Sequence, residues 1–231
     1  MNKQIHQVYG IFRDAIPIKE MPLFYDNVRA TKDFAKKNGY KYKMWDKKQS
    51  LNLIKNSYPQ YLKVYNSFPL DIQRADFIRY AILDKYGGIY IDADVRPIKS
   101  LDTLFSRPYF FVHWNTDKSK TPYNAVMGSH KNNPLFKDIL KHSEESYYKI
   151  KDKPAYQGKL GSGARKGRFV NETTGGNMIK RVFNQNKISF KNVLNILKVI
   201  DKNGKVRTSG KSPFFMDFNA IEWYKKGVGG I

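Results

Sequence analysis

Two aspartates, Asp92 and Asp94, stand two residues apart in a strongly β-forming run, residues 89–95. Residues two apart on a strand project from the same face of the sheet, so we expect the two carboxylates to lie side by side. Paired carboxylates repel one another unless a cation neutralises them, and their oxygens suit Mn²⁺ or Mg²⁺, ions that also bind a diphosphate. The carboxyl ends of strands are also where open α/β sheets bind ligands. A solvated acidic turn is the alternative, since a lone Asp-x-Asp is common.

A second pair of ionisable residues, Asp76 and Arg79, precedes this run on a segment with helical periodicity, residues 70–86. At about 100° per residue, Arg79 falls within the apolar sector of the helix and Asp76 lies at its edge. Charges on the inward face of a helix are unfavourable unless they are paired or face a polar cleft. Two interpretations stay open: a structural salt bridge between positions i and i+3, or two side chains that contact a ligand.

The elements that must hold these side chains begin with a β–α–β pattern. Alternating residues predict strands at 4–9 and 40–45, and a helix at 21–38 lies between them. This order is typical of an α/β domain with parallel strands, and we expect one such domain over residues 1–231. The remaining patterns predict helices over 49–68 with a break at Pro59, after Pro134, at 177–183 and at 191–200, a strand at 109–114, and a polar loop over 151–168.

The composition is that of a folded protein with a strong positive charge. The 231 residues include 42 Lys and Arg against 20 Asp and Glu, a formal net charge of +22. Such a field attracts nucleic acid, acidic lipid surfaces or phosphorylated small molecules, although lysines spread along the chain can equally cover a solvated surface. The lack of cysteine excludes disulfides and thiolate metal sites. With no apparent membrane span or signal segment, we expect a soluble, cytoplasmic protein.

Several other functional classes find little support in the sequence. The four histidines are too dispersed for a zinc site, and no Gly-x-Ser-x-Gly nucleophile motif is present. The basic segment 161–168 lacks the ending of a P-loop, so it is either a solvated loop or an element that orders over an anionic ligand. Charge and tyrosine content are compatible with nucleic-acid binding. The sequence nevertheless contains no recognisable nucleic-acid motif, and no nucleic-acid partner is expected.

The segment around the two aspartates resembles the glycosyltransferase family defined by its DXD sugar-binding motif. That family includes yeast-type initiating mannosyltransferases, inositol-phosphoceramide mannosyltransferases and bacterial capsule enzymes, and is more distantly similar to the catalytic domains of clostridial glucosylating toxins. The resemblance implies a GT-A type α/β fold with a Rossmann-like central mixed sheet flanked by helices. It also places Asp76 and Arg79 among the contacts to the donor sugar. The residues that carry it are Arg79, Leu83, Gly87, Gly88, Ile89, Tyr90, Asp92 and Asp94.

Weaker motif similarities extend the resemblance along the chain. The first strand is similar to the family's Ile-His-Gln-x-Trp, which implies that Gln7 and Tyr9 bind the donor, with Tyr9 stacking on the nucleotide base. Asn124 lies in a stretch that resembles one whose asparagine is near the donor sugar. Residues 173–176 match a Thr-Gly-Pro element, with Gly176 in place of proline.

The C-terminal part departs from the family's pattern, which usually supplies a further metal or phosphate ligand from a His-containing element and a Ser-Trp. No histidine follows His142 in this chain. Either Asp217, Asn219 or Glu222 takes that role, or a water does, or the chain is shortened relative to the family. The predicted metal ligands are Asp92, Asp94 and Asp217.

Together with these residues, the resemblance implies a metal-dependent hexosyltransferase that uses a UDP- or GDP-sugar and retains the anomeric configuration. Mn²⁺ or Mg²⁺ would be the cofactor, held on the donor diphosphate by Asp94 and by Asp92, the latter through the ribose or a water. A glycan, glycolipid or protein would be the acceptor, and peripheral association with anionic surfaces would fit the charge. A basic nucleic-acid-binding protein and an inactive relative with the same fold are the alternatives. The predicted catalytic residues are Asp76, Arg79, Asp92 and Asp94.

Overall fold

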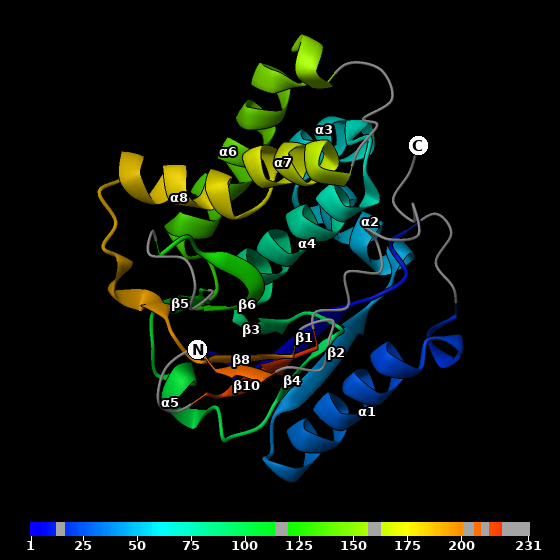
Figure 1. The fold of residues 1–231 in the computed structure, drawn as a ribbon, viewed down its shortest axis with the longest axis vertical. Helices are drawn as coiled ribbons and strands as arrows, with labels where there is room; N and C mark the ends of the chain where they lie inside the picture. The colour runs from blue at the N-terminus through cyan, green and yellow to red at the C-terminus, as the bar shows by residue number, and fades with distance from the viewer. Residues whose placement is uncertain (13–16, 114–119, 157–162, 201–205, 209–212, 219–231) are drawn as a thin grey trace.

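The computed structural model describes residues 1–12, 17–113, 120–156, 163–200, 206–208 and 213–218 (Figure 1). The helices are α1 (Pro22–Lys37), α2 (Lys47–Ser57), α3 (Leu62–Ser67), α4 (Asp71–Tyr86), α5 (Asp102–Phe105), α6 (Pro134–Ile150), α7 (Gly163–Thr173) and α8 (Gly176–Gln185), with short 3-10 turns at Ile18–Glu20, Pro59–Tyr61, Pro154–Tyr156 and Phe190–Asn192. The strands are β1 (Gln4–Val8), β2 (Lys41–Trp45), β3 (Gly88–Ile91), β4 (Val95–Pro97), β5 (Tyr109–Val112), β6 (Tyr123–Ser129), β7 (Val193–Leu194), β8 (Leu197–Ile200), β9 (Val206–Thr208) and β10 (Phe215–Asp217).

The strands form a central mixed sheet and a smaller second sheet. The central sheet has the order β2-β1-β3-β6-β5-β7. Its β1 runs parallel to β2 and β3, β6 runs antiparallel to β3 and β5, and β7 runs parallel to β5. The second sheet has the order β4-β10-β8-β9, with β10 antiparallel to β4 and parallel to β8. The predicted α/β architecture, a central mixed sheet flanked by helices, is confirmed.

Apolar side chains on β3 alternate between two cores, one on each face of the central sheet. Tyr90 packs into the core shared with α2, α3, α4, α6, α7 and α8, whereas Ile89 and Ile91 pack into the core shared with α1, α5 and the second sheet. The same division into layers is visible in Figure 1. Because α4 is surrounded by sheet and helices, it buries residues all round its axis, and any charge on it must find a partner within the protein.

Three local predictions are wrong. The strand expected over 89–95 ends at Ile91, since the Val95 amide donates to the Asp92 carbonyl at 3.0 Å and β4 then joins the second sheet. The helix expected over 191–200 is a 3-10 turn followed by β7 and β8, because pairing with β5 and β10 overrides a weak helical pattern.

The loop expected over 151–168 contains a 3-10 turn, and α7 begins at Gly163, because Phe169 and Val170 on one face of that helix are buried. Residues 157–162 and Trp114, which fall within the predicted loop and strand, lie outside the described residues. Within the described parts of the chain, no helix is both long and apolar enough to cross a bilayer.

Gly87 and Gly88 set the point at which β3 enters the central sheet. Their φ angles are +66° and +96°, a region that favours glycine. A Cβ on Gly87 would lie 2.6 Å from the backbone N of Lys131, and one on Gly88 would lie 2.5 Å from the carbonyl O of Gln4. The backbones of Lys131 and Gln4 approach these glycines so closely that the start of β3 is fixed. The position of Asp92, directly after the end of this short strand, is fixed with it.

His6 is a buried, neutral histidine beneath the same turn. Its Nε2 lies 3.0 Å from the carbonyl O of Gly87, and the Trp45 Nε1 donates to its Nδ1 at 3.1 Å. A carbonyl only accepts, so Nε2 carries the proton and Nδ1 is the acceptor. Burial lowers the pKa of His6 to about 4, with a further lowering by the Lys43 charge and an opposing effect of the Gly87 hydrogen bond.

We expect His6 to make the fold acid-sensitive. An unfolded histidine titrates near 6.5, so between pH 6.5 and 4 the unfolded state binds a proton that the folded state excludes. The contribution of His6 is present above about pH 6.5 and is lost as pH falls. Relative to His6→Gln, wild type should lose about 2–3 kcal/mol of unfolding free energy between pH 7 and pH 4.5. Urea denaturation of both proteins at each pH measures this difference, and a pH-independent difference would contradict the assignment.

Candidate active site

Asp92 follows the last residue of β3 and is placed by three strands. Its amide donates to the carbonyl of Ala125 on β6 at 2.8 Å, and the Gln7 Nε2 on β1 donates to its carbonyl at 3.1 Å. The Tyr90 hydroxyl on β3 donates to Oδ1 of Asp92 at 2.6 Å. The Asp92 side chain keeps 25% of its surface exposed. Its backbone is therefore fixed while one edge of the carboxylate faces solvent.

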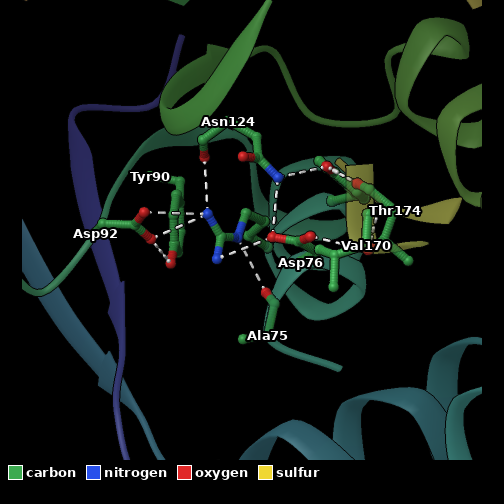
Figure 2. A network of polar contacts seen from close by, with 9 residues as sticks. Ala75, Asp76, Tyr90, Asp92, Asn124, Val170 and Thr174 are labelled. Atoms are coloured by element: carbon green, nitrogen blue, oxygen red, sulfur yellow. Dashed lines mark hydrogen bonds and ion pairs between the residues drawn. The ribbon is translucent and has the colours of Figure 1, made fainter. Parts of the chain in front are cut away.

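Arg79 on α4 brings a buried cation to the Asp92 carboxylate (Figure 2). Its Nη1 lies 3.0 Å from Oδ1 of Asp92, and its Nη2 lies 3.2 Å from Oδ1 of Asp76. Its remaining hydrogen bonds go to the carbonyls of Ala75 and Asn124, each at 3.0 Å. Burial lowers the pKa of Arg79, but the carboxylates outweigh that effect and raise it above its usual value. The predicted i, i+3 pair is present, and Asp92 extends it.

Asp76 is held by donors from three segments of the chain. Its Oδ1 accepts from the Asn124 Nδ2 at 2.9 Å and forms an ion pair with Arg79, and its Oδ2 accepts from the Thr174 hydroxyl at 2.8 Å. Tyr80 supports this arrangement, since its hydroxyl accepts from the Asn124 Nδ2 at 2.8 Å and donates to the Thr174 carbonyl. Burial raises the pKa of Asp76 to about 6, despite the lowering effects of Arg79 and the hydrogen bonds. The carboxylate is ionised at neutral pH and gains a proton in mild acid.

Asp94 and Asp217 lie near one another where the central sheet passes into the second sheet. The amide of the residue after Asp217 donates to the Asp94 carbonyl at 3.1 Å. Asp94 is partly exposed, whereas Asp217 is buried. Burial raises the pKa of Tyr123 well above its usual value, and the charges of Asp217, Asp94 and Asp92 raise it further. Three of the predicted site carboxylates therefore lie close enough to influence one hydroxyl.

The shared face predicted for Asp92 and Asp94 from strand alternation is wrong, because both residues lie beyond the end of β3, in the turn that leads to β4. Among the described residues, no group of three His, Asp or Glu side chains forms a ready-made metal-binding cluster. The metal-ligand set Asp92, Asp94 and Asp217 stays a prediction. Asn219 and Glu222, the alternative third ligands, lie outside the described residues.

The two donor-binding residues predicted on the first strand differ in accessibility. Gln7 is buried, and its amide holds the Asp92 carbonyl while its Oε1 accepts from the Tyr42 hydroxyl at 2.9 Å. Tyr9 is partly exposed at the end of β1, with its ring centroid 5.9 Å from that of Phe24. In this structure Gln7 positions Asp92, whereas Tyr9 is partly exposed and stays a predicted contact to the donor.

Three residues that contact the predicted site were assigned no role there from the sequence, although two of them stand in motifs that carry the resemblance: Tyr80, Tyr90 and Thr174. A signal existed for two of them, since Tyr90 is two residues before Asp92 on a strand and Tyr80 is four residues after Asp76 on a helix. Thr174 is 98 residues from Asp76 along the chain, and no local pattern predicts that contact.

Residues 24–111 match the family described as the glycosyltransferase sugar-binding region containing the DXD motif. The matched segment includes Asp76 and the whole motif from Arg79 to Asp94 that carries the resemblance. This segment is similar to the sugar-binding region of DXD glycosyltransferases.

Curated proteins that are similar to this chain include viral and yeast proteins. An uncharacterised glycosyltransferase of Acanthamoeba polyphaga mimivirus is 36% identical over 140 residues, which cover 60% of this chain and 53% of the viral protein. Inositol phosphoceramide mannosyltransferase 2 of Schizosaccharomyces pombe is 37% identical over 107 residues, or 46% of this chain and 30% of the enzyme. Mannosyl phosphorylinositol ceramide synthase CSH1 of Saccharomyces cerevisiae is 38% identical over 112 residues, or 47% and 29%. The chain therefore spans about half of the viral relative and under a third of these yeast enzymes.

Among solved structures, the PaToxG glycosyltransferase shares this fold. The two align with a TM-score of 0.50 at 18% identity, over 80% of this chain and 69% of the other. The GT-A type fold predicted for this chain is confirmed by this likeness and by the central mixed sheet.

Loss of the Arg79 cation should strongly destabilise the fold. Arg79→Met leaves the buried carboxylate of Asp76 and the partly exposed one of Asp92 without their cation and should lower the unfolding free energy by about 3–5 kcal/mol. Asp76→Asn keeps Arg79 paired with Asp92 and keeps an amide that can bond Thr174, so its loss should be about 1–2 kcal/mol. Chemical denaturation at pH 7 measures both values.

The matched control for this prediction is Arg29→Met. Arg29 lies 4.0 Å from Asp33 on the exposed face of α1, with both side chains largely in solvent, so we expect no measurable loss there. Equal losses in the two arginine variants would contradict the role of Arg79 as the buried cation.

Proposed function

We propose that this protein transfers a hexose from a UDP- or GDP-sugar to a glycan, lipid or protein acceptor, in a reaction that depends on Mn²⁺ or Mg²⁺ and retains the anomeric configuration. The observation that carries this proposal is the Arg79 guanidinium, which joins Asp76 to Asp92 directly after the carboxyl-terminal end of β3. In this arrangement, Asp76 and Arg79 would form hydrogen bonds with the sugar. The partly exposed carboxylate of Asp92 lies next to them and would bind the metal–diphosphate.

The carboxylates available in the turn after β3 fit a divalent cation shared with a substrate. Mg²⁺ and similar hard ions are commonly bound by one or two protein carboxylates together with substrate phosphates and waters. Asp92 and Asp94 are both partly exposed, so their oxygens can meet such a ligand. We therefore assign Asp94 and Asp92 as the residues that would hold the ion, with Asp217 as the predicted third ligand. Once bound, the ion supplies positive charge that stabilises the departing nucleoside diphosphate.

Asp76, Arg79 and Asn124 form a pre-arranged set of polar groups for the donor sugar. Their side chains are nearly buried, and Asp76 and Arg79 keep only 6% and 4% of their surfaces exposed. The sugar would contact these exposed edges, while the bonds among the three residues fix their orientation. Such positioning accelerates transfer by aligning the anomeric carbon with the acceptor.

Retention of configuration follows in this proposal from attack on the same face as the leaving group. Both oxygens of Asp76 already accept hydrogen bonds, which suits an orienting group better than a covalent nucleophile. The acceptor hydroxyl oxygen forms the new bond to the anomeric carbon while the bond from that carbon to the diphosphate oxygen breaks. The hydroxyl proton passes to the departing diphosphate oxygen, so no protein base is required.

The named relatives suggest which donor to test first. Two of the yeast relatives reported above are named as enzymes of mannosyl transfer to an inositol phosphoceramide. We propose mannose as the first candidate hexose, and a lipid-linked acceptor follows from the same names. The deciding experiment incubates the protein with GDP-mannose and a panel of UDP- and GDP-hexoses, with Mn²⁺ or with EDTA, and measures nucleoside diphosphate release. Release from no donor, beside salt-sensitive oligonucleotide binding, would favour the nucleic-acid alternative.

Asp94→Asn should abolish metal-dependent turnover while leaving the fold intact, because it removes one charge from a partly exposed ligand. We expect a loss of at least about 100-fold in nucleoside diphosphate release, on the scale of a lost electrostatic contact at a reacting centre. Asp102→Asn is the matched control, since Asp102 is exposed and pairs with Lys3 at 2.7 Å. Full activity in Asp94→Asn would remove Asp94 from the metal site.

Tyr9→Ala should weaken binding of the free nucleoside diphosphate by about 1–3 kcal/mol if the ring stacks on the base. Tyr9→Phe keeps the ring and should bind normally. Isothermal titration with UDP and GDP in the presence of Mn²⁺ measures both variants. Unchanged affinity in Tyr9→Ala would mean that Tyr9 only packs against Phe24.

A further inference from the structure

Thr174 lies in the short connection between α7 and α8, far in sequence from the DXD turn, and reaches into the same polar network (Figure 2). The residue is fully buried, and its hydroxyl donates to Oδ2 of Asp76 at 2.8 Å. A buried hydroxyl directed at an ionised carboxylate is a charge-assisted hydrogen bond, stronger than one between neutral groups. The α7–α8 connection therefore contacts one of the predicted catalytic residues directly.

The backbone around Thr174 is held tightly, so its hydroxyl has a fixed direction. The Thr174 amide donates to the carbonyl of Val170 at 2.8 Å, and its carbonyl accepts from the Tyr80 hydroxyl. A Cβ on Gly175 would lie 2.8 Å from Oδ1 of Asn171, and one on Gly176 would lie 2.6 Å from the carbonyl O of Pro122. Gly175 thus lets the connection pack closely against α7, and Gly176 lets it pack against the residue that precedes β6, the strand that carries Asn124.

The two oxygens of Asp76 have separate partners. Oδ1 accepts from Asn124 and forms an ion pair with Arg79, whereas Oδ2 accepts from the Thr174 hydroxyl. The contacts to Oδ1 hold that atom in place but do not by themselves fix the plane of the carboxylate. A donor on the second oxygen defines the plane of the group, and with it the direction in which Asp76 can accept a bond from a ligand.

We propose that Thr174 is a positioning residue, which sets the orientation of the Asp76 carboxylate for sugar transfer. This inference rests on the proposed function, in which Asp76 orients the donor sugar. It requires a hydroxyl at position 174 rather than a particular shape, so serine should replace threonine and valine should not. Thr174 acts through Asp76 and needs no contact with the substrate.

A threonine one residue earlier provides a matched control. Thr173 is equally buried and accepts from the Gln73 Nε2 at 2.7 Å while donating to the carbonyl of Phe169 at 2.8 Å. Thr173→Val therefore removes a buried hydroxyl from the same connection without touching Asp76. Any general loosening of α7 and α8 should appear in both valine variants.

The experiment compares wild type, Thr174→Val, Thr174→Ser and Thr173→Val in metal-dependent transfer from the active nucleotide-sugar. We expect Thr174→Val to lower kcat about 10- to 100-fold, on the scale of a lost hydrogen bond to a charged group. Nucleoside diphosphate affinity should stay within about twofold, since Asp76 is predicted to contact the sugar and not the phosphates. Thr174→Ser should recover most of the activity, and Thr173→Val should retain it.

The pH profile separates positioning from a purely structural effect. A hydrogen bond from Thr174 favours the ionised form of Asp76, so its removal should move the acid limb of kcat/KM to higher pH in Thr174→Val alone. The other charged or titratable groups around this carboxylate are unchanged by the substitution: Arg79, Tyr80, Tyr90 and Asp92.

The outcomes are distinguishable. Equal kcat and equal acid limbs in wild type and Thr174→Val overturn the role of Thr174 and leave the proposed function standing. Equal losses in Thr174→Val and Thr173→Val, or no recovery in Thr174→Ser, also overturn it, because the hydroxyl on Asp76 would then not be the cause. A folded wild type that turns over no nucleotide-sugar overturns the proposed function, and the role of Thr174 falls with it.

Discussion

The burial of the Arg79 guanidinium on α4 is the physical constraint on which the site depends. Arg79 projects from α4, a helix buried on all sides, and an unpaired charge there would be strongly destabilising. Carboxylates from Asp76 and Asp92 compensate it, one from the same helix and one from the turn after β3. The cation fixes where the turn can lie, because moving Asp92 away would leave Arg79 only partly compensated.

This constraint ties together segments that are distant in the sequence. Asp92 is held by β1 and β6 through its backbone, Asp76 by β6 through Asn124, and the α7–α8 connection joins through Thr174. A fully bonded polar network of this kind is rigid and leaves few alternative arrangements. Rigidity suits a site in which groups must be oriented before the substrate arrives, since a reaction gains most from groups that need no rearrangement.

Local sequence patterns predicted α1, α4, β1 and β2, because these elements have clear periodicity and are followed by glycines or turns. They also predicted that α4 carries charged residues on its inward face. They predicted the region 191–200 wrongly, where pairing with distant strands decided between helix and strand. The turn that contains Asp92 and Asp94 was taken as strand, since Val95 continues the apolar alternation but belongs to the second sheet. The resemblance singled out residues 173–176, but the bond from Thr174 to Asp76 could not be predicted, because it depends on how α7 packs against α4.

The site and the rest of the chain carry opposite charge. The chain as a whole is strongly basic, yet in the predicted site Asp76 and Asp92 pair with Arg79, and the charges of Asp92, Asp94 and Asp217 all act on the Tyr123 hydroxyl. A basic surface draws phosphorylated ligands toward the protein, but a cluster of carboxylates repels them at short range. In the proposed function a divalent cation would remove this conflict, since it would neutralise the aspartates and accept phosphate oxygens at once. The proposed site would then bind its anionic donor together with a metal ion rather than by basic side chains alone.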